Sequence, residues 1–227
     1  MQVNEAILYR RSIRNFTSEP IPFEDLIKIV EAARWAPTAV NRQRTRFVVV
    51  TDEALLKKIA ENAKIIFFKQ KHAAQAAAMI VICLDSIVWV EEVGAAVQNM
   101  LLEAYSLKIG SCWIGAFEKE VVRNLLKIPQ SFKLLGLILL GYYSEYPKPS
   151  PRLELGQMAF LNQWRTPLVK SKAGILPKSG ALSFITKQLT DTGEALEKSP
   201  LADVAKSSEP DWFIYKCIQK KKKLNFF

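Results

Sequence analysis

The chain has 227 residues, of which 49% are hydrophobic and 24% are charged, and its formal net charge is +10. This composition is ordinary for a soluble globular protein, and no apolar run approaches the roughly 18 residues that a membrane span needs. The first residues lack the basic start and the apolar core of a signal peptide, so we expect a cytoplasmic protein with no membrane span.

Histidine and cysteine usage excludes two common kinds of site. His72 is the only histidine, and the three cysteines, Cys83, Cys112 and Cys217, are far apart in the sequence. A Cys/His metal site needs closely spaced ligands, and a Ser-His or Cys-His triad needs a suitably placed histidine. We therefore predict no metal site and no triad, and we interpret Cys83 and Cys112 as small core residues.

Helical and strand patterns alternate from the N-terminus to about residue 143. In chain order the predicted helices are 4–10, 22–35, 53–62, 91–107 and 118–127, and the predicted strands are 47–50, 79–84, 111–117 and 134–143. Asp52 is a suitable N-cap for the third helix, and Gly110 is a suitable left-handed cap after the fourth. The uninterrupted β-branched run 48–50 predicts a strand that is buried on both faces. Alternating strands and helices indicate a layered α/β or α+β domain.

The composition changes after residue 145. Residues 146–151 are rich in proline, and from residue 170 onward Gly, Pro, Ser and Lys are scattered. We predict a domain over residues 1–169 and a partly helical, basic extension over residues 170–227, with helices near 181–196 and 211–220. The lysine-rich end makes a nucleic-acid or anionic-surface binding protein one alternative. The chain lacks the regularly spaced aromatic residues of a base-stacking surface, which weakens that alternative.

Three arginines and a serine lie close together near the N-terminus. Arg10, Arg11, Ser12 and Arg14 fall within one helical turn or its unwinding end, so the guanidinium groups can converge on one anion. Guanidinium forks with a hydroxyl group suit a phosphate monoester. The alternative is a basic face that only contacts solvent.

A polar loop separates the helix 22–35 from the strand 47–50. Pro37, Thr38, Asn41 and Gln43 place hydroxyl and amide groups between two rigid elements, where loops often carry function. The alternative is a plain connection whose Thr and Asn cap the backbone.

The arginine cluster and the loop together resemble the nitroreductase family. Further segments match in the same order: 94–104 is similar to the family's central helix, 107–115 to its strand and flavin-edge turn, and 139–141 to a strand end. The resemblance covers roughly residues 3–155. It implies an α+β layered fold with a central, mainly antiparallel sheet flanked by helices, and a homodimer with flavin sites at its interface.

The resemblance also implies a set of FMN-binding residues. The N-terminal arginines and Ser12 would hold the phosphate and ribityl chain, helped by Arg152 and Lys148. The loop would reach the flavin from the partner subunit. Ile114 and Gly115 would lie along the flavin edge, where a backbone N–H can form a hydrogen bond with the ring. The complete set is Arg10, Arg11, Ser12, Arg14, Pro37, Thr38, Ala39, Asn41, Gln43, Ile114, Gly115, Lys148 and Arg152.

The chemistry that the resemblance implies belongs mostly to the cofactor. NADH or NADPH would reduce the flavin, which would pass electrons to a small acceptor, such as a nitroaromatic or a quinone, in a ping-pong scheme. No catalytic side chain and no nucleic-acid partner are predicted.

The chain departs from the family pattern at two positions after the loop. Arg44 and Thr45 stand where the family commonly has proline and an aromatic residue, which would favour an anionic acceptor or the nicotinamide phosphate. The alternatives within the family are the dimethylbenzimidazole synthases and the dehalogenases.

Overall fold

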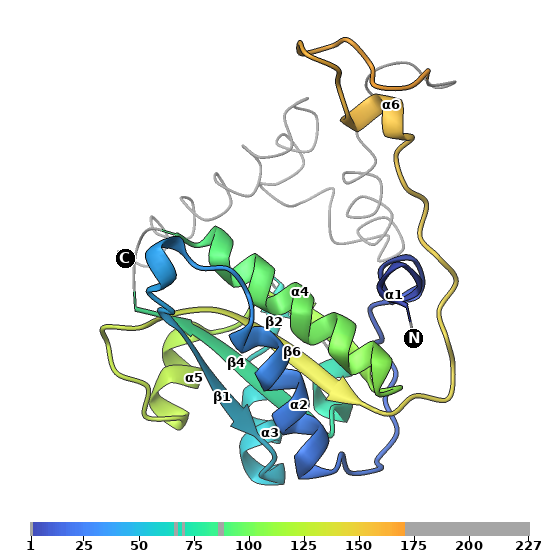
Figure 1. Cartoon of the computed structure of the whole chain (residues 1–227). Coiled ribbons are helices and arrows are strands. Elements are labelled where there is room, and N and C mark those ends of the chain that lie inside the picture. The colour runs from blue at the N-terminus through green and yellow to red at the C-terminus, as the bar shows by residue number, and fades with distance from the viewer. Residues whose placement is uncertain (1, 66–67, 70, 86–88, 171–227) are drawn as a thin grey trace, which may run out of the picture. The chain divides into compact units, whose positions relative to one another are not determined.

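A computed structural model of the chain describes residues 2–65, 68–69, 71–85 and 89–170 (Figure 1). The chain divides into two compact units, Met1–Pro149 and Ser150–Phe227. The predicted helices 181–196 and 211–220 lie outside the described residues. The predicted domain boundary after residue 169 stays a prediction, since the extension beyond residue 170 is not described.

The first unit contains most of the described helices and strands. In chain order they are α1 (Val3–Tyr9), α2 (Phe23–Arg34), η1 (Ala39–Asn41), β1 (Thr45–Val50), α3 (Glu53–Glu61), β2 (Lys64–Ile65), β3 (Phe68–Lys69), η2 (Lys71–Gln75), β4 (Ala78–Leu84), α4 (Glu91–Ser106), β5 (Gly110–Ile114), α5 (Lys119–Leu125) and β6 (Lys133–Gly141). The second unit contributes α6 (Leu155–Met158). The predicted helices and strands of the first unit are confirmed to within a few residues at their ends.

Four strands form the central sheet in the order β1-β4-β6-β5, and each neighbouring pair is antiparallel. The α+β prediction is therefore confirmed. A short second sheet pairs β2 with β3.

Strand β4 is buried along its whole length because helices cover both faces of the sheet. Successive side chains of a strand point to opposite faces. Met79 and Val81 join a core cluster with α3 and α5, whereas Ile80 and Ile82 join a second cluster with α2 and α4. Figure 1 shows α2 and α4 running across one face of this sheet. The uninterrupted apolar run 79–84 predicted this strand correctly.

Strand β1 differs from its prediction. Among the described residues it is the outer strand of the sheet and pairs only with β4, so no other described strand lies on its far side. Val48 and Val49 are half-buried, and Val50 is its one fully buried residue. The prediction of a strand buried on both faces is wrong because β-branched residues also suit an edge strand.

The two predicted caps had different outcomes. Asp52 caps α3, since its Oδ1 atom accepts a hydrogen bond from the Leu55 backbone N–H at 2.8 Å. The left-handed residue after α4 is Lys108, with a φ of 60°, and Gly110 instead begins β5. A Cβ atom at Gly110 would lie 2.7 Å from the Tyr143 ring, so this glycine permits a close approach.

Cys83 and Cys112 are core residues, as predicted. They are 2% and 1% exposed, and burial raises the pKa of the Cys83 thiol to about 11. Within the described ranges, no helix combines the length and the apolar character that a membrane crossing requires.

Candidate functional site

The N-terminal strip, residues 10–14, lies along the outer edge of β5. The Ile13 backbone N–H donates to the Ser111 carbonyl oxygen at 2.9 Å, and Ser12 and Ser111 form a parallel bridge. Ile13 is 3% exposed and packs into the core. Because neighbouring residues of an extended chain point in opposite directions, Ser12 and Arg14 lie on the side of the strip away from the core.

Arg11 supports the end of α1. Its Nη1 atom donates to the carbonyl oxygens of Leu8 at 2.8 Å and Arg10 at 3.0 Å. Its guanidinium carbon lies 5.9 Å from the centre of the Tyr146 ring, and the Tyr146 hydroxyl donates to the Tyr9 carbonyl. The Arg11 Nε atom is buried and has no hydrogen-bond partner among the described residues. Arg11 therefore holds the strip in place and still has one buried donor available.

The positive charges of the strip act on two nearby groups. Burial raises the pKa of the Cys112 thiol on β5, and the charges of Arg14 and Arg10 act in the opposite direction. Burial also lowers the pKa of His72, and the charge of Arg14 lowers it further. The structure thus brings Arg10, Ser12 and Arg14 together beside one strand and creates a positive region there.

Strand β5 also leads to Ile114 and Gly115, the residues predicted to lie along the flavin edge. Ile114 ends β5 and is 6% exposed, and Gly115 follows it on the surface. Ile114 is three positions after Ser111 along the strand, a distance of about 10 Å. A Cβ atom placed on Gly115 would have no other atom within 4 Å, so the space above this turn is open.

The polar loop, residues 36–43, has a strained backbone. Val40, Asn41 and Gln43 have φ values of 52°, 54° and 49°. The left-handed region costs an L residue about 1–2 kcal/mol, and a β-branched residue such as Val40 is rarely found there. Such a conformation persists where the surrounding contacts determine it.

Side-chain hydrogen bonds stabilise the loop. The Gln43 backbone N–H donates to Thr38 Oγ1 at 3.2 Å, and Gln43 Nε2 donates to Asn41 Oδ1 at 2.9 Å. The Ala39 backbone N–H donates to the Oε1 atom of Glu92, on α4, at 2.7 Å. Gln43 therefore bonds to both Thr38 and Asn41 within the loop.

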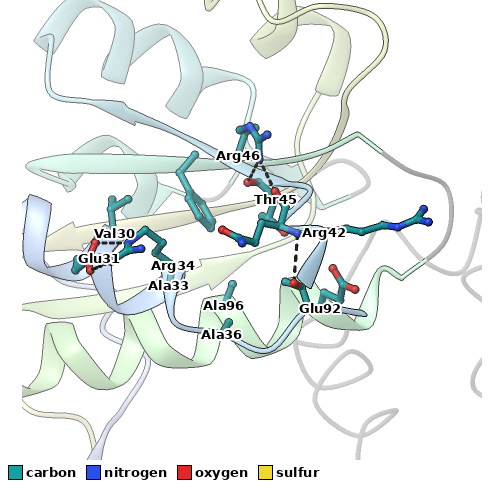
Figure 2. Close-up of a pocket in the computed structure, with 13 residues that line it drawn as sticks. Val30, Glu31, Ala33, Arg34, Ala36, Arg42, Thr45, Arg46, Glu92 and Ala96 are labelled. Carbon is teal, nitrogen blue, oxygen red and sulfur yellow. Dashed lines mark hydrogen bonds and ion pairs between the residues drawn. The ribbon is translucent and has the colours of Figure 1, made fainter. Parts of the chain in front are cut away.

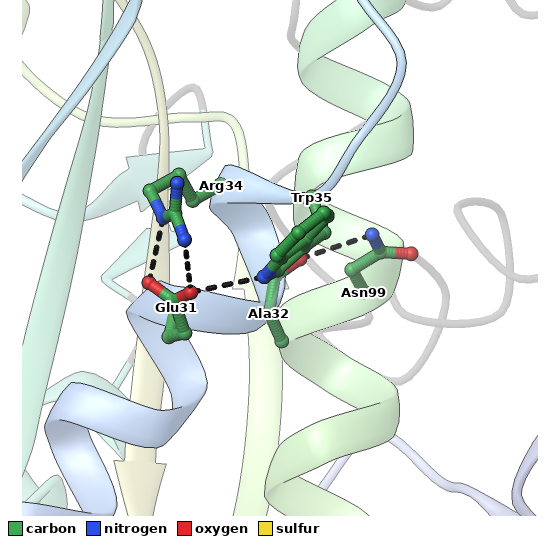
Figure 3. Close-up of polar contacts among 5 residues, drawn as sticks. All are labelled: Glu31, Ala32, Arg34, Trp35 and Asn99. Carbon is green, nitrogen blue, oxygen red and sulfur yellow. Dashed lines mark hydrogen bonds and ion pairs between the residues drawn. The ribbon is translucent and has the colours of Figure 1, made fainter.

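The helix end that precedes the loop is also fixed (Figure 3). Glu31 accepts from Arg34 Nε at 2.7 Å and from Trp35 Nε1 at 2.9 Å. The Arg34 hydrogen bond is the main reason that the pKa of Glu31 is lowered. Asn99 on α4 donates to the Ala32 carbonyl oxygen at 3.0 Å, which ties the end of α2 to α4.

A cavity of about 600 Å³ lies between α2, the loop, β1 and α4 (Figure 2). This volume is in the range of small-molecule sites. Figure 2 shows Arg34 at one end, Arg42 and Glu92 at the other, and Ala36 and Ala96 between them. The full lining is Val30, Glu31, Ala33, Arg34, Ala36, Thr38, Arg42, Gln43, Thr45, Arg46, Phe47, Glu92 and Ala96.

Two of the predicted loop residues, Thr38 and Gln43, line this cavity, whereas Pro37, Ala39 and Asn41 do not. Thr45 lines the cavity and Arg44 does not. The arginines of the lining are Arg34, Arg42 and Arg46. The sequence prediction missed Glu92. Glu92 lies four residues before Ala96 and eight before Met100, so it is on the buried face of α4. This helical spacing in the sequence could have indicated that Glu92 is buried.

The strip and the loop lie at opposite ends of α4 in one chain. The strip bonds to Ser111, shortly after the last residue of α4, whereas the loop bonds to Glu92, in the first turn of α4. A helix of 16 residues is about 24 Å long. Figure 1 shows α1 near the C-terminal end of α4 and the loop near its N-terminal end. One chain therefore keeps the two groups of predicted residues apart.

The remaining two predicted residues belong to different units. Lys148 is exposed in the first unit, in a segment without helix or strand, and Arg152 is exposed in the second unit. Their role in binding a phosphate stays a prediction.

Comparison with known proteins decides the family. The sequence model of the Nitroreductase family matches residues 7–142, which is more than half of the chain. The chain belongs to the nitroreductase family. The match begins just before the N-terminal strip and ends just after β6, so it includes the strip, the loop and the whole central sheet.

Named relatives and solved structures of the nitroreductase family agree with this assignment. The chain is 38% identical over 147 residues to a protein of Archaeoglobus fulgidus assigned as an NADH dehydrogenase/NAD(P)H nitroreductase, covering 60% of this chain and 82% of that one. It is 29% identical over 181 residues to the oxygen-insensitive NADPH nitroreductase of Salmonella typhimurium, covering 71% and 74%. The FMN-dependent nitroreductase of Clostridium difficile superposes with a TM-score of 0.63 at 27% identity, covering 71% of this chain and 99% of that structure.

Proposed function

We propose that this nitroreductase-family protein is an FMN-dependent oxidoreductase that transfers electrons from NADH or NADPH to a small acceptor, such as a nitroaromatic or a quinone. The names of its relatives support the proposal, because they include an NADPH nitroreductase, an FMN reductase of Bacillus subtilis and an FMN-dependent nitroreductase. Such an enzyme has no need of a nucleic-acid partner. The cytoplasmic location stays a prediction.

The residues of the strip suit the phosphate of FMN. A phosphate monoester carries nearly two negative charges, and arginine forks bind it through charge-assisted hydrogen bonds. Arg10, Ser12 and Arg14 lie together beside β5, and the buried Nε atom of Arg11 has no described partner. The open space above Gly115 gives a planar ring room to approach the backbone.

The observation that supports a flavin site built from two chains is the separation of the strip from the loop, within one chain, by the length of α4. A two-fold axis that brings the loop of one chain to the strip of a second copy would form the same pairing twice. We therefore propose a homodimer with two equivalent flavin sites, each built from the strip and the β5 turn of one chain and the loop of its partner.

The flavin supplies the two-electron chemistry when it is bound, and the chain supplies its binding and orientation. The arginines of the strip fix the phosphate and add positive charge. Thr38 and Asn41 offer polar groups to the ring from the partner chain. No side chain is assigned to a proton or group-transfer step.

A subunit-mixing experiment tests the two-chain site. One variant loses the strip charges (Arg10→Ala with Arg14→Ala), and the other loses loop contacts (Thr38→Ala with Asn41→Ala). Each variant alone should retain little FMN. Mixed dimers, isolated after co-expression with two different tags, contain one intact site and should bind about one FMN, against about two for wild-type dimers. Mixed dimers that bind no FMN would contradict the two-chain arrangement.

An absorption spectrum tests the chemistry separately. Flavin bands that bleach when NADH or NADPH is added without oxygen are expected. A flavin protein that neither nucleotide bleaches would favour the dimethylbenzimidazole synthase or dehalogenase alternatives. A protein that fails to take up FMN would favour the basic binding protein.

A further inference from the structure

Glu92 is a buried carboxylate in the first turn of α4. It is 8% exposed, whereas Glu91, its neighbour in the same turn, is exposed. Both carry the charge that a helix N-terminus favours. Solvent can satisfy Glu91, but Glu92 faces the cavity beside the loop and depends on the protein for its hydrogen bonds.

The two oxygens of Glu92 have different surroundings. Oε1 accepts the Ala39 backbone N–H at 2.7 Å, which is the length of a charge-assisted hydrogen bond. Oε2 is buried and has no partner among the described residues. An unpartnered buried oxygen destabilises the fold, so Glu92 is a poor choice for a residue that only packs.

The hydrogen bond to Glu92 joins the loop to an element that does not flank it in the sequence. Among the described residues, the other hydrogen bonds of residues 36–43 lie within the loop or join it to the flanking ends of α2 and β1. Val40, at the centre, is 88% exposed, so packing does not hold its left-handed backbone. The hydrogen bond from Ala39 to Glu92 ties the strained turn to α4.

We propose that Glu92 is a positioning residue for the flavin-binding loop. Its carboxylate holds Ala39 and so keeps the neighbouring Thr38 and Asn41 in the conformation that meets the flavin of the partner chain. This inference rests on the proposed function, because it assigns Glu92 a role in FMN binding.

The test compares variants at Glu92 with a matched control at Glu91. FMN dissociation constants are measured on the apo-protein by quenching of flavin fluorescence, and melting temperatures are measured without flavin. Glu92→Ala should weaken FMN binding about tenfold, because a hydrogen bond to a charged group is lost. Glu92→Asp should do the same, since its shorter side chain cannot reach Ala39. Glu92→Gln keeps an oxygen acceptor and should stay within about threefold, and Glu91→Ala within about twofold.

A rescue variant separates positioning from general stability. Asn tolerates the left-handed region better than Val, and Val40 is exposed, so Val40→Asn relieves strain without removing packing. The double variant with Val40→Asn and Glu92→Ala should bind FMN about threefold more tightly than Glu92→Ala alone. A role in stability alone predicts a lower melting temperature and no recovery of affinity.

The outcomes distinguish this inference from the proposed function. A wild-type protein that does not bind FMN would overturn the proposed function. A wild-type protein that binds FMN, together with Glu92→Ala and Glu92→Asp variants that bind it equally well, would overturn the role of Glu92 and leave the proposed function standing.

Discussion

The N-terminal strip and the polar loop supply the two groups of predicted flavin-binding residues, and the fold holds them in different ways. The strip is bonded through its backbone to β5 and anchored by Ile13 and Phe16, which are 3% and 7% exposed. The loop is largely exposed, has three left-handed residues, and depends on side-chain hydrogen bonds. The strip is therefore fixed to the core through Ile13 and β5, whereas the loop is a local structure at the surface.

This difference separates stability from binding. A change that disturbs the anchors of the strip should unfold the protein and release the flavin together. A change in the loop should weaken flavin binding while the free energy of unfolding stays nearly constant, because little apolar area is buried there.

The largest effect is expected at Ile13. Ile13→Ala removes a buried side chain from the core and should lower the free energy of unfolding by about 2–5 kcal/mol. The matched control is Val40→Ala in the loop, where the side chain is 88% exposed and the change should stay within about 0.5 kcal/mol. Urea unfolding of the two apo-variants gives the comparison. Equal losses would contradict a core strip and a locally held loop.

A smaller effect, on binding alone, is expected at Arg14. This residue is exposed, so Arg14→Ala should leave the urea midpoint unchanged. It should weaken FMN binding by about 10- to 100-fold, since a charge-assisted contact to the phosphate is worth about 1.5–3 kcal/mol. Lys57→Ala, an exposed charge removed from α3, is the control and should have no effect on binding. Unchanged binding by Arg14→Ala would place the phosphate away from the strip.

The smallest effect expected is a pH dependence of the protein's stability, which arises from His72 near Arg14 of the strip. Burial, then the charge of Arg14, lowers the pKa of His72, so the folded protein binds fewer protons here than the unfolded chain. Stability should therefore fall as the pH drops below about 6.5, and it should be unaffected well above that value. At the loop end, the pKa of Glu31 is lowered from 4.5, so its contribution is lost only below about that pH.

Melting temperatures of the apo-protein between pH 7.5 and 5.5 measure this dependence. His72→Gln removes the titrating group, so wild type should lose more stability than the variant as the pH falls. Parallel curves for the two proteins would show that His72 does not contribute.

Local sequence patterns determined much of the fold. The apolar run of β4 predicted a buried strand, the side chain of Asp52 predicted the start of α3, and the alternation of strands and helices predicted a layered domain. The mainly antiparallel sheet was predicted only from the resemblance to the nitroreductase family. The arginines of the strip and the polar groups of the loop were also recognisable, because their chemistry is carried by residue type. These features depend on neighbours within about one helical turn or one strand.

Tertiary structure decided what depends on distant partners. The outer position of β1 follows from strand order, which the valines of that strand do not encode. Gly110 is needed for a close approach to Tyr143, which lies just after β6, and Lys108 supplies the left-handed turn instead. Glu92 became a candidate positioning residue because the fold brings Ala39 within hydrogen-bond distance of a carboxylate more than fifty residues away in sequence. Such pairings are set by the packing of whole elements, which single residues do not reveal.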